Sequence, residues 1–179
     1  MLAGKSVVLR PVKRSDVSYF LKWFNDDEVT RYLKLHLPVT EMAQEKLIEE
    51  LATTRAGTEA WFIIEAIEDG DHRVIGATDL NRINHKDHSA AFSIVIGEKE
   101  YWGKGHGTEA CRLIINYGFE QLNLHRISSS VVSYNERSIR MHKRVGFKEE
   151  GRQREAWFKN GAYHDNVVFG ILRGEWKEG

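Results

Sequence analysis

Seven consecutive residues near the middle of the chain have the composition of a phosphate-binding loop. They read Trp102-Gly103-Lys104-Gly105-His106-Gly107-Thr108 and join an apolar, strand-like segment to a helix-like one. Glycines at alternate positions let the backbone approach a ligand closely and adopt positive φ. Consecutive N–H groups at a helix N-terminus then point outward and, with the helix dipole and the charge of Lys104, suit a phosphate or pyrophosphate. A glycine turn before a packed helix gives the same pattern, so the loop needs support from the rest of the sequence.

Two other phosphate-binding motifs fit this loop less well. Gly105-x-Gly107-x-x-Ala110 matches a dinucleotide fingerprint in form. That motif follows the first strand of a βαβ unit, with an acidic residue about 20 residues further on. Here it lies in mid-chain after a charged segment, and no acidic residue is suitably placed. The Gly-Lys-Ser/Thr ending of the nucleotide P-loop is absent. A nicotinamide-dependent oxidoreductase is therefore a weaker interpretation, which fails if no nicotinamide cofactor binds.

Apolar periodicity predicts the elements that position this loop. Alternating or continuous apolar runs predict strands at 7–9, 61–67, 73–83, 90–96, 126–132, 153–159 and 163–172. Helical spacing predicts helices at 15–24, 29–35, 107–122 and 135–145, and one more that Thr40 caps with Met42, Leu47, Ile48 and Leu51 facing inward. The order predicts an α+β fold, in which helices flank a mixed sheet.

Composition limits the classes of function. The chain has 179 residues with 26 basic and 26 acidic side chains, so no global charge points to nucleic acid or a membrane surface. No window approaches the roughly 20 apolar residues of a membrane span. No signal peptide is recognisable at the N-terminus, and a single cysteine, Cys111, excludes an internal disulfide. We therefore expect one domain, residues 1–179, in the cytoplasm.

Several segments in this order resemble the GNAT superfamily of acetyl-coenzyme A (acetyl-CoA)-dependent N-acetyltransferases, specifically its RimJ/RimL-type subgroup. They span nearly the whole chain: Val8-Leu9-Arg10-Pro11, Asn25-Asp26-x-x-Val29, Glu100 to Gly105, Thr108-Glu109-Ala110, Asn135-Glu136-Arg137-Ser138, Gly146-Phe147, Asn160-Gly161-x-Tyr163-x-Asp165 and Leu172-x-x-Glu175-Trp176. The resemblance implies a three-layer fold, with about seven mostly antiparallel strands flanked by helices. It also implies acetyl-CoA as co-substrate, no metal, and an amine as acceptor.

The resemblance assigns a cofactor role to three parts of the chain. Residues 102–108 would hold the pyrophosphate of coenzyme A (CoA), where the family usually has Gln or Arg in place of Trp102. The backbone of Ile94, Val95 and Ile96 would pair with the pantetheine arm like an added strand, and a free N–H there would stabilise the oxyanion. Asn135 and Ser138 would hydrogen-bond the cofactor from the far side. Four basic residues on the same helix would attract phosphates or form a solvated face: Arg137, Arg140, Lys143 and Arg144.

Acetyl transfer from a thioester needs a neutral amine and a proton for the leaving thiolate. The family often supplies that proton from a tyrosine at the position of His142. Asn135, Ser138 and His142 are spaced three and four apart, so one helical face presents all three. An intrinsic pKa of about 6.5 would make His142 usable as an acid at neutral pH, although it could instead only pack beside the cofactor. Tyr134 is a second candidate acid.

Other candidate groups carry weaker signals. Subgroup members often have a glutamate on the cofactor strand where this chain has Ala91, so Glu28 and Asp79 are alternative bases. Cys111 has no His or Asn signature and is expected in the core. Two histidines in the loop at 85–88 could suggest a metal, but they lack further ligands.

The sequence leaves the acceptor amine open. A protein N-terminus such as that of a ribosomal protein, a polyamine or another small amine all fit, as does a homodimer. We expect the acceptor site between Trp23–Tyr32 and the final hairpin, Trp157–Asp165, because aromatic walls suit an amine. Because both the tyrosine and the strand glutamate are replaced, a CoA-binding regulatory module with impaired catalysis is the alternative function.

Overall fold

Eight strands form one mixed sheet in the computed structural model, which describes residues 1–36 and 38–177. The strands are β1 Leu2–Ala3, β2 Val7–Pro11, β3 Ala60–Glu68, β4 Asp71–Asn84, β5 Ser89–Ile96, β6 Arg126–Val132, β7 Lys148–Lys159 and β8 Ala162–Leu172. Their spatial order is β1-β2-β3-β4-β5-β6-β8-β7, and only the β5–β6 pair is parallel. The one strand beyond the predicted seven is β1, whose two residues are too few to show alternation.

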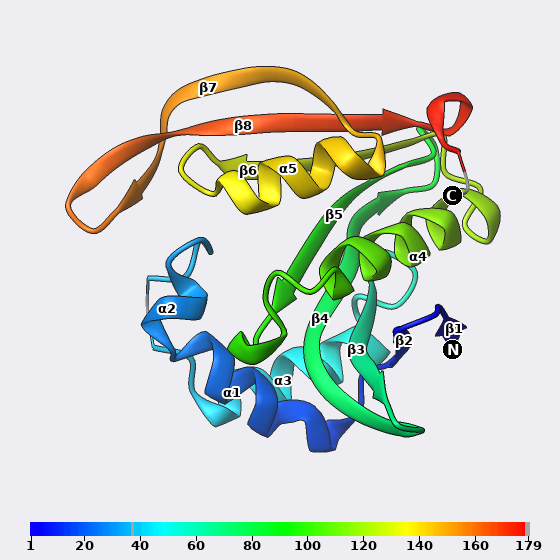
Figure 1. Cartoon of the computed structure of the whole chain (residues 1–179), viewed down its shortest axis with the longest axis vertical. Coiled ribbons are helices and arrows are strands. Elements are labelled where there is room, and N and C mark those ends of the chain that lie inside the picture. Colours follow the sequence, from blue (N-terminus) through cyan, green and yellow to red (C-terminus); the bar gives the residue numbers. More distant parts are fainter. Residues whose placement is uncertain (37, 178–179) are drawn as a thin grey trace.

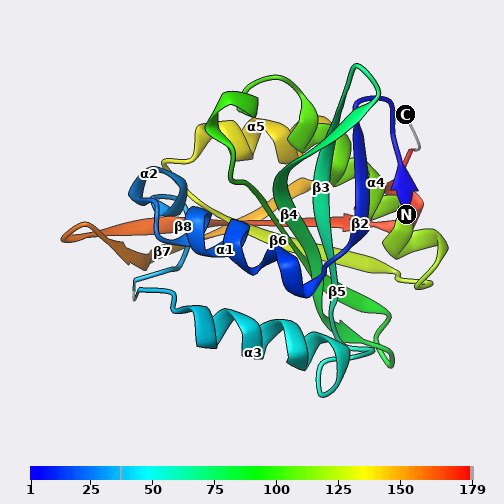
Figure 2. The same cartoon turned by 90° about the horizontal axis from the view of Figure 1, so that it is seen from below.

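Helices cover both faces of the sheet, which confirms the α+β, three-layer prediction (Figures 1 and 2). The α-helices are α1 Val17–Phe24, α2 Asp27–Thr30, α3 Glu41–Ala52, α4 His106–Glu120 and α5 Glu136–Val145. On one face, α4 packs its apolar side, including Ile114 and Phe119, into the main core. On the other face, Phe20 and Trp23 of α1 pack against Ile63 of β3. No helix among the described residues is long and apolar enough to cross a membrane.

Two expectations about the helices are wrong. The helix expected at 29–35 is only the short α2, which Asp26 caps through the N–H groups of Glu28 and Val29. The segment after Thr30 leaves the helix and lies along the cleft described below. Met42 is 79% exposed, whereas Gln44 is buried. The reason is rotational: at about 100° per residue, Gln44 lies roughly 40° from the core-facing Ile48, and Met42 lies roughly 120° away.

The parallel pair β5–β6 opens the sheet. Its register covers only Ser89–Ala91 against Arg126–Ser128, after which the strands diverge (Figure 1). At the point of divergence the hydroxyl of Ser129 donates to the carbonyl of Phe92 at 3.1 Å. Beyond that bond the backbone edge of β5 faces open space instead of β6.

Candidate functional site

A cleft of about 880 Å³ fills the space between the diverging strands. It is walled by β5 and β6, by the glycine loop and α5, and by parts of residues 29–34, β7 and β8. Most of the residues predicted to bind the cofactor line it: Ile94, Val95, Ile96, Trp102, Gly103, Gly105, Gly107, Thr108, Asn135 and Ser138. The structure therefore brings three separate sequence segments to one site.

Two of the three glycines in this loop have the positive φ that the sequence predicts, whereas Gly107 already lies within α4. Gly103 and Gly105 have φ of 78° and 97°, in the left-handed region that favours glycine. The helix α4 begins directly after Gly105, and the Thr108 N–H donates back to the Gly105 carbonyl. Fifteen residues of α4 align their dipoles behind this turn, so its positive end lies at the cleft.

Two side chains of the loop turn away from the cleft. The ammonium of Lys104 lies 5.4 Å from the ring centroid of Tyr101, and the His106 ring packs on the same tyrosine. Neither residue is part of the cleft wall. Any contribution of these two residues to phosphate binding comes from their backbone N–H groups and, for Lys104, from long-range charge.

Alternate residues of β5 direct their backbone toward the cleft. The Phe92 carbonyl accepts from Ser129, and the Ile96 carbonyl accepts from Trp102 Nε1 at 2.7 Å, both on the open side. Strand geometry alternates from residue to residue, so the backbone of Ile94 faces the cleft and that of Val95 faces β4. Of the three residues expected to pair with the pantetheine arm, Ile94 therefore has the freest backbone groups. Val95 contributes its side chain instead.

Trp102 occupies the position where the resemblance implies a polar side chain. Its indole is held by the Ile96 carbonyl, and the Arg137 guanidinium lies 5.1 Å from its ring centroid. Arg137, Arg140 and Arg144 all line the cleft, whereas Lys143 is paired with Glu149. Three of the four basic residues predicted on α5 thus face the cofactor end.

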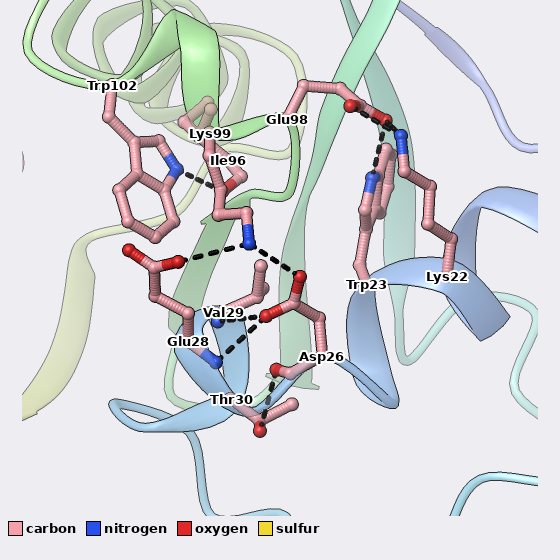
Figure 3. Close-up of polar contacts among 10 residues, drawn as sticks. All are labelled: Lys22, Trp23, Asp26, Glu28, Val29, Thr30, Ile96, Glu98, Lys99 and Trp102. Atoms are coloured by element: carbon pink, nitrogen blue, oxygen red, sulfur yellow. Dashed lines mark hydrogen bonds and ion pairs between the residues drawn. The ribbon is translucent and has the colours of Figure 1, made fainter.

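Polar contacts tie the α1–α2 segment to the start of this loop (Figure 3). Glu98 accepts from Lys22 at 2.6 Å and from the indole N–H of Trp23 at 3.0 Å. Lys99 bridges Asp26 and Glu28 at 2.9 and 3.0 Å. These contacts hold the α1–α2 segment against the residues that lead into the glycine loop. They also engage the carboxylate of Glu28, one of the two alternative bases, outside the cleft wall.

His142 is almost fully buried, with 2% of the residue exposed. Its ring packs against the rings of Phe92, Phe147 and Phe169, yet it still lines the cleft. Burial lowers the pKa of His142 to about 4. The expectation that His142 titrates near 6.5 is therefore wrong, and at neutral pH the ring is uncharged. The role of His142 in protonating the leaving thiolate stays a prediction.

Hydrogen bonds fix the tautomer of the neutral His142 ring. Nδ1 lies 2.8 Å from the Ser138 carbonyl, which only accepts, so Nδ1 carries the proton. Nε2 lies 2.9 Å from Ser129 Oγ and accepts the hydroxyl proton of that serine. Ser129 also lines the cleft, and its one proton is shared between His142 and the Phe92 carbonyl. Sequence reasoning missed Ser129, because a serine within a β-strand carries no signal of its own.

Tyr134, the second candidate acid, lies outside the cleft wall. Its hydroxyl donates to the Arg31 carbonyl at 2.6 Å, and its ring contacts Tyr32 and His164. Partial burial raises the pKa of this phenol. In this arrangement Tyr134 anchors the segment that follows α2, and its role as an acid stays a prediction.

Asp79, the other alternative base, is a buried carboxyl next to the cleft. It is 6% exposed and hydrogen-bonds the side chains of Asn81 and Ser93, both of which line the cleft. Burial is the main reason that the pKa of Asp79 rises to about 7. The Ser93 hydroxyl is exposed and faces Asn81 Nδ2 at 3.1 Å. Ser93 therefore lies between the cleft and the Asp79 carboxyl.

The end of the cleft away from the glycine loop is lined by side chains from distant parts of the sequence. Lys34 lies with its ammonium 4.8 Å from the ring centroid of Trp157. Asn166 is 4% exposed and donates to Gln153 Oε1 at 2.9 Å. Tyr32 and Trp157 line this end as expected, but Trp23 is wholly buried under the sheet and takes no part. Sequence reasoning missed the lining residues Lys34, Arg82, Gln153 and Asn166, which belong to no motif.

Two weaker candidates have ordinary surroundings. Cys111 is fully buried on α4, as expected, and burial raises the pKa of its thiol. His85 Nε2 lies 2.7 Å from the Gly57 carbonyl. Within residues 1–36 and 38–177, no group of three or more His, Cys, Asp or Glu side chains could hold a metal ion.

The sequence and fold of this chain are similar to those of known proteins. A family model described as an acetyltransferase (GNAT) domain matches residues 6–148. Spermidine N(1)-acetyltransferase of Escherichia coli (strain K12) is 30% identical over 181 residues, covering 98% of this chain and 91% of the relative. The putative ribosomal N-acetyltransferase YdaF of Bacillus subtilis (strain 168) is 36% identical over 107 residues, covering 60% and 58%. The structure of spermidine N-acetyltransferase from Vibrio cholerae with CoA and spermine superimposes with a TM-score of 0.87 at 28% identity, covering 96% of this chain and 98% of that one.

Proposed function

The chain belongs to the GNAT acetyltransferase family and is an acetyl-CoA-dependent N-acetyltransferase, and we propose that it transfers the acetyl group directly to a primary amine in a ternary complex. The observation that carries this proposal is the open edge of β5 beside a glycine loop at a helix N-terminus. The edge offers backbone groups to a peptide-like arm, and the loop offers N–H groups to a phosphate. Both surfaces line one cleft, which has room for an acceptor at its other end.

We assign the cofactor contacts accordingly. Residues 103–108 hold the pyrophosphate, and the cleft-facing arginines of α5 attract the phosphates. The Ile94 backbone pairs with the pantetheine arm. Asn135 caps α5 through its Oδ1, which accepts from the Ser138 N–H at 3.1 Å, so its side-chain N–H groups are left to donate to the cofactor.

The chemical steps use groups on either side of β5. A backbone N–H at Ile94 stabilises the oxyanion that forms when the amine attacks the thioester. Ser93 passes the proton of the amine to Asp79, whose pKa of about 7 suits a base at neutral pH. On the far side, the Ser129 hydroxyl turns its one proton from His142 Nε2 and the Phe92 carbonyl to donate a hydrogen bond to the leaving thiolate, which then takes its proton from water. Cys111 takes no part, because no acetyl-enzyme forms.

The names of the relatives specify their acceptors more closely than the primary amine that we propose here. Two of them are named for spermidine, and one for a ribosomal substrate. A polyamine and a protein N-terminus are thus both candidates here, and the RimJ/RimL-type resemblance covers both kinds of acceptor. The rival function, a CoA-binding regulatory module, receives no support from these relatives, which are all named as acetyltransferases.

A panel of primary amines tests the proposal. The purified protein is incubated with acetyl-CoA and each amine, and thiol release is followed together with the mass of the acetylated product. Amine-dependent thiol release supports the proposal. Tight binding of CoA by calorimetry without thiol release from any amine would favour the regulatory module instead.

A further inference from the structure

The acceptor end of the cleft carries positive charge and no carboxylate in its wall. Lys34 lines this end, Arg82 of β4 adds a second cation to the wall of the same cleft, and no aspartate or glutamate is among the described residues of the lining. Among the described residues no ion pair joins either cation to a carboxylate, and the ammonium of Lys34 lies over the face of Trp157. A polycation such as a polyamine would place its charges in a cleft whose described lining carries cations and no carboxylate, which costs free energy.

The carboxylates close to this end already form hydrogen bonds or ion pairs with other side chains. Asp79 lies behind the wall, engaged with Asn81 and Ser93, where it can serve one reacting amine. Glu59 accepts from the indole of Trp61 at 2.8 Å and pairs with Arg55. No second or third carboxylate is left in the lining to hold the remaining ammonium groups of a polyamine.

Polar atoms at the same end lack partners. The Asn166 Oδ1 atom and the Trp157 Nε1 atom are buried without a hydrogen bond in the structure. Both residues line the cleft, and buried polar groups of this kind are normally satisfied. One accepts and the other donates. A ligand with an N–H donor and an anionic acceptor would satisfy both.

We infer that the acceptor is a primary amine that also carries an anionic group, a carboxylate or a phosphate, which Lys34 binds while Arg82 adds to the positive charge of the cleft and Asn166 Oδ1 accepts from the amine. This inference rests on the proposed function and narrows its acceptor. It separates this chain from the relatives named for spermidine, because the charge of the acceptor end has the wrong sign for that substrate. The indole N–H of Trp157 is a further donor for the anion.

Matched substrate pairs test the charge requirement. ω-Amino acids of increasing length are compared with their carboxamides, phosphoethanolamine with ethanolamine, and spermidine is run alongside. The wild-type protein should show kcat/KM values about tenfold or more higher for the anionic member of a pair, and the better anion identifies the chemistry. The preference should weaken as salt is added.

Charge-reversal variants locate the requirement. Lys34→Glu and Arg82→Glu should each lower kcat/KM for the anionic acceptor about tenfold and raise it for spermidine. Lys86→Glu is the matched control, because Lys86 is an exposed lysine in the β4–β5 turn outside the cleft wall, and neither value should change. CoA affinity should be the same in all three variants, which shows that each remains folded.

Two outcomes would overturn the inference, and they are distinguishable. A wild-type protein that prefers spermidine, with no gain in Lys34→Glu, rejects the anionic acceptor and leaves amine acetylation standing. If no amine, whatever its charge, supports thiol release, the proposed function is rejected together with the inference.

Discussion

The two ends of the cleft differ in the groups that line them: backbone groups line one end, and side chains line the other. The proposed cofactor end consists of backbone N–H groups from residues 103–108 and the exposed edge of one strand, around Ile94. The proposed acceptor end consists of side chains from segments far apart in the sequence, exemplified by Lys34, Trp157 and Asn166. Backbone groups bind a ligand regardless of which side chains the residues carry. Binding at the first end should therefore be sensitive to substitutions that alter the backbone conformation. The second should respond to changes of charge and hydrogen bonding.

The largest effect is expected from Gly105→Val, which tests the cofactor end. The φ of 97° is strained for a residue with a side chain, and the new side chain would project where the phosphate approaches. Strain and lost charge-assisted hydrogen bonds together amount to about 4 kcal/mol, so CoA affinity should fall on the order of a thousandfold. Isothermal titration calorimetry measures it.

Gly70→Val is the control for backbone strain alone. Gly70 has φ of 89° in the β3–β4 turn, and a Cβ there would meet no atom within 4 Å, as at Gly105. Its variant should lose stability but keep CoA affinity. Equal losses of affinity in the two variants would mean that the loop does not bind the phosphates.

Asp79→Asn tests the acceptor end and should leave CoA affinity unchanged. Loss of the base should lower kcat/KM for the amine about 100-fold. Because a base works when deprotonated, the wild-type rate should rise as pH passes about 7, and this rise should vanish in the variant. An unchanged pH profile would remove Asp79 from the reaction.

Stability gives an independent reading of the same carboxyl. Burial raises the pKa of Asp79 from 3.8 to about 7, so the wild-type protein loses stability as pH rises between these values. Asn stays neutral, so Asp79→Asn should raise the melting temperature more at pH 8 than at pH 4.

A smaller effect is expected at His142, where the two ends meet. Because the ring is neutral and serves one hydrogen bond to Ser129, His142→Phe should lower kcat by about tenfold, with CoA affinity little changed. His142→Gln, which can still accept from Ser129, should recover part of the loss. A loss above 100-fold, accompanied by a change in the pH profile near 6.5, would instead support the hypothesis that a protonated His142 acts as the acid.

The stability of the protein should also report the state of His142. The folded pKa of about 4 lies below the usual 6.5, so the contribution is present above pH 6.5 and is lost as pH falls toward 4. His142→Phe should flatten this part of the stability curve.

The smallest effect on turnover is expected from Cys111→Ala, which touches neither end. The thiol is buried in the core, and its raised pKa keeps it protonated. Turnover should stay within about twofold, although the lost packing should cost about 1 kcal/mol of stability. Mass spectrometry of quenched wild-type enzyme should find no acetyl group on Cys111, and finding one would contradict direct transfer.

Local patterns carried the predictions that succeeded. Glycine spacing in 103–107 sets positive φ within a few residues, and helical spacing places Asn135, Ser138 and His142 on one face, which the cleft lining confirms. Predictions failed where the outcome depended on packing between elements. Met42 has an apolar side chain, but the rotation of α3 about its axis points it to solvent.

The sequence by itself determined the order of the elements, the phosphate loop and the family, because each depends on residues close together or on motifs in fixed order. Only the tertiary structure decided the protonation of His142 and Asp79, since burial by distant segments, not residue type, sets their pKa values. It also decided the charge of the acceptor end. Lys34 and Arg82 are ordinary surface residues in the sequence, and they become a site because the divergence of β5 from β6 opens a cleft that both of them line.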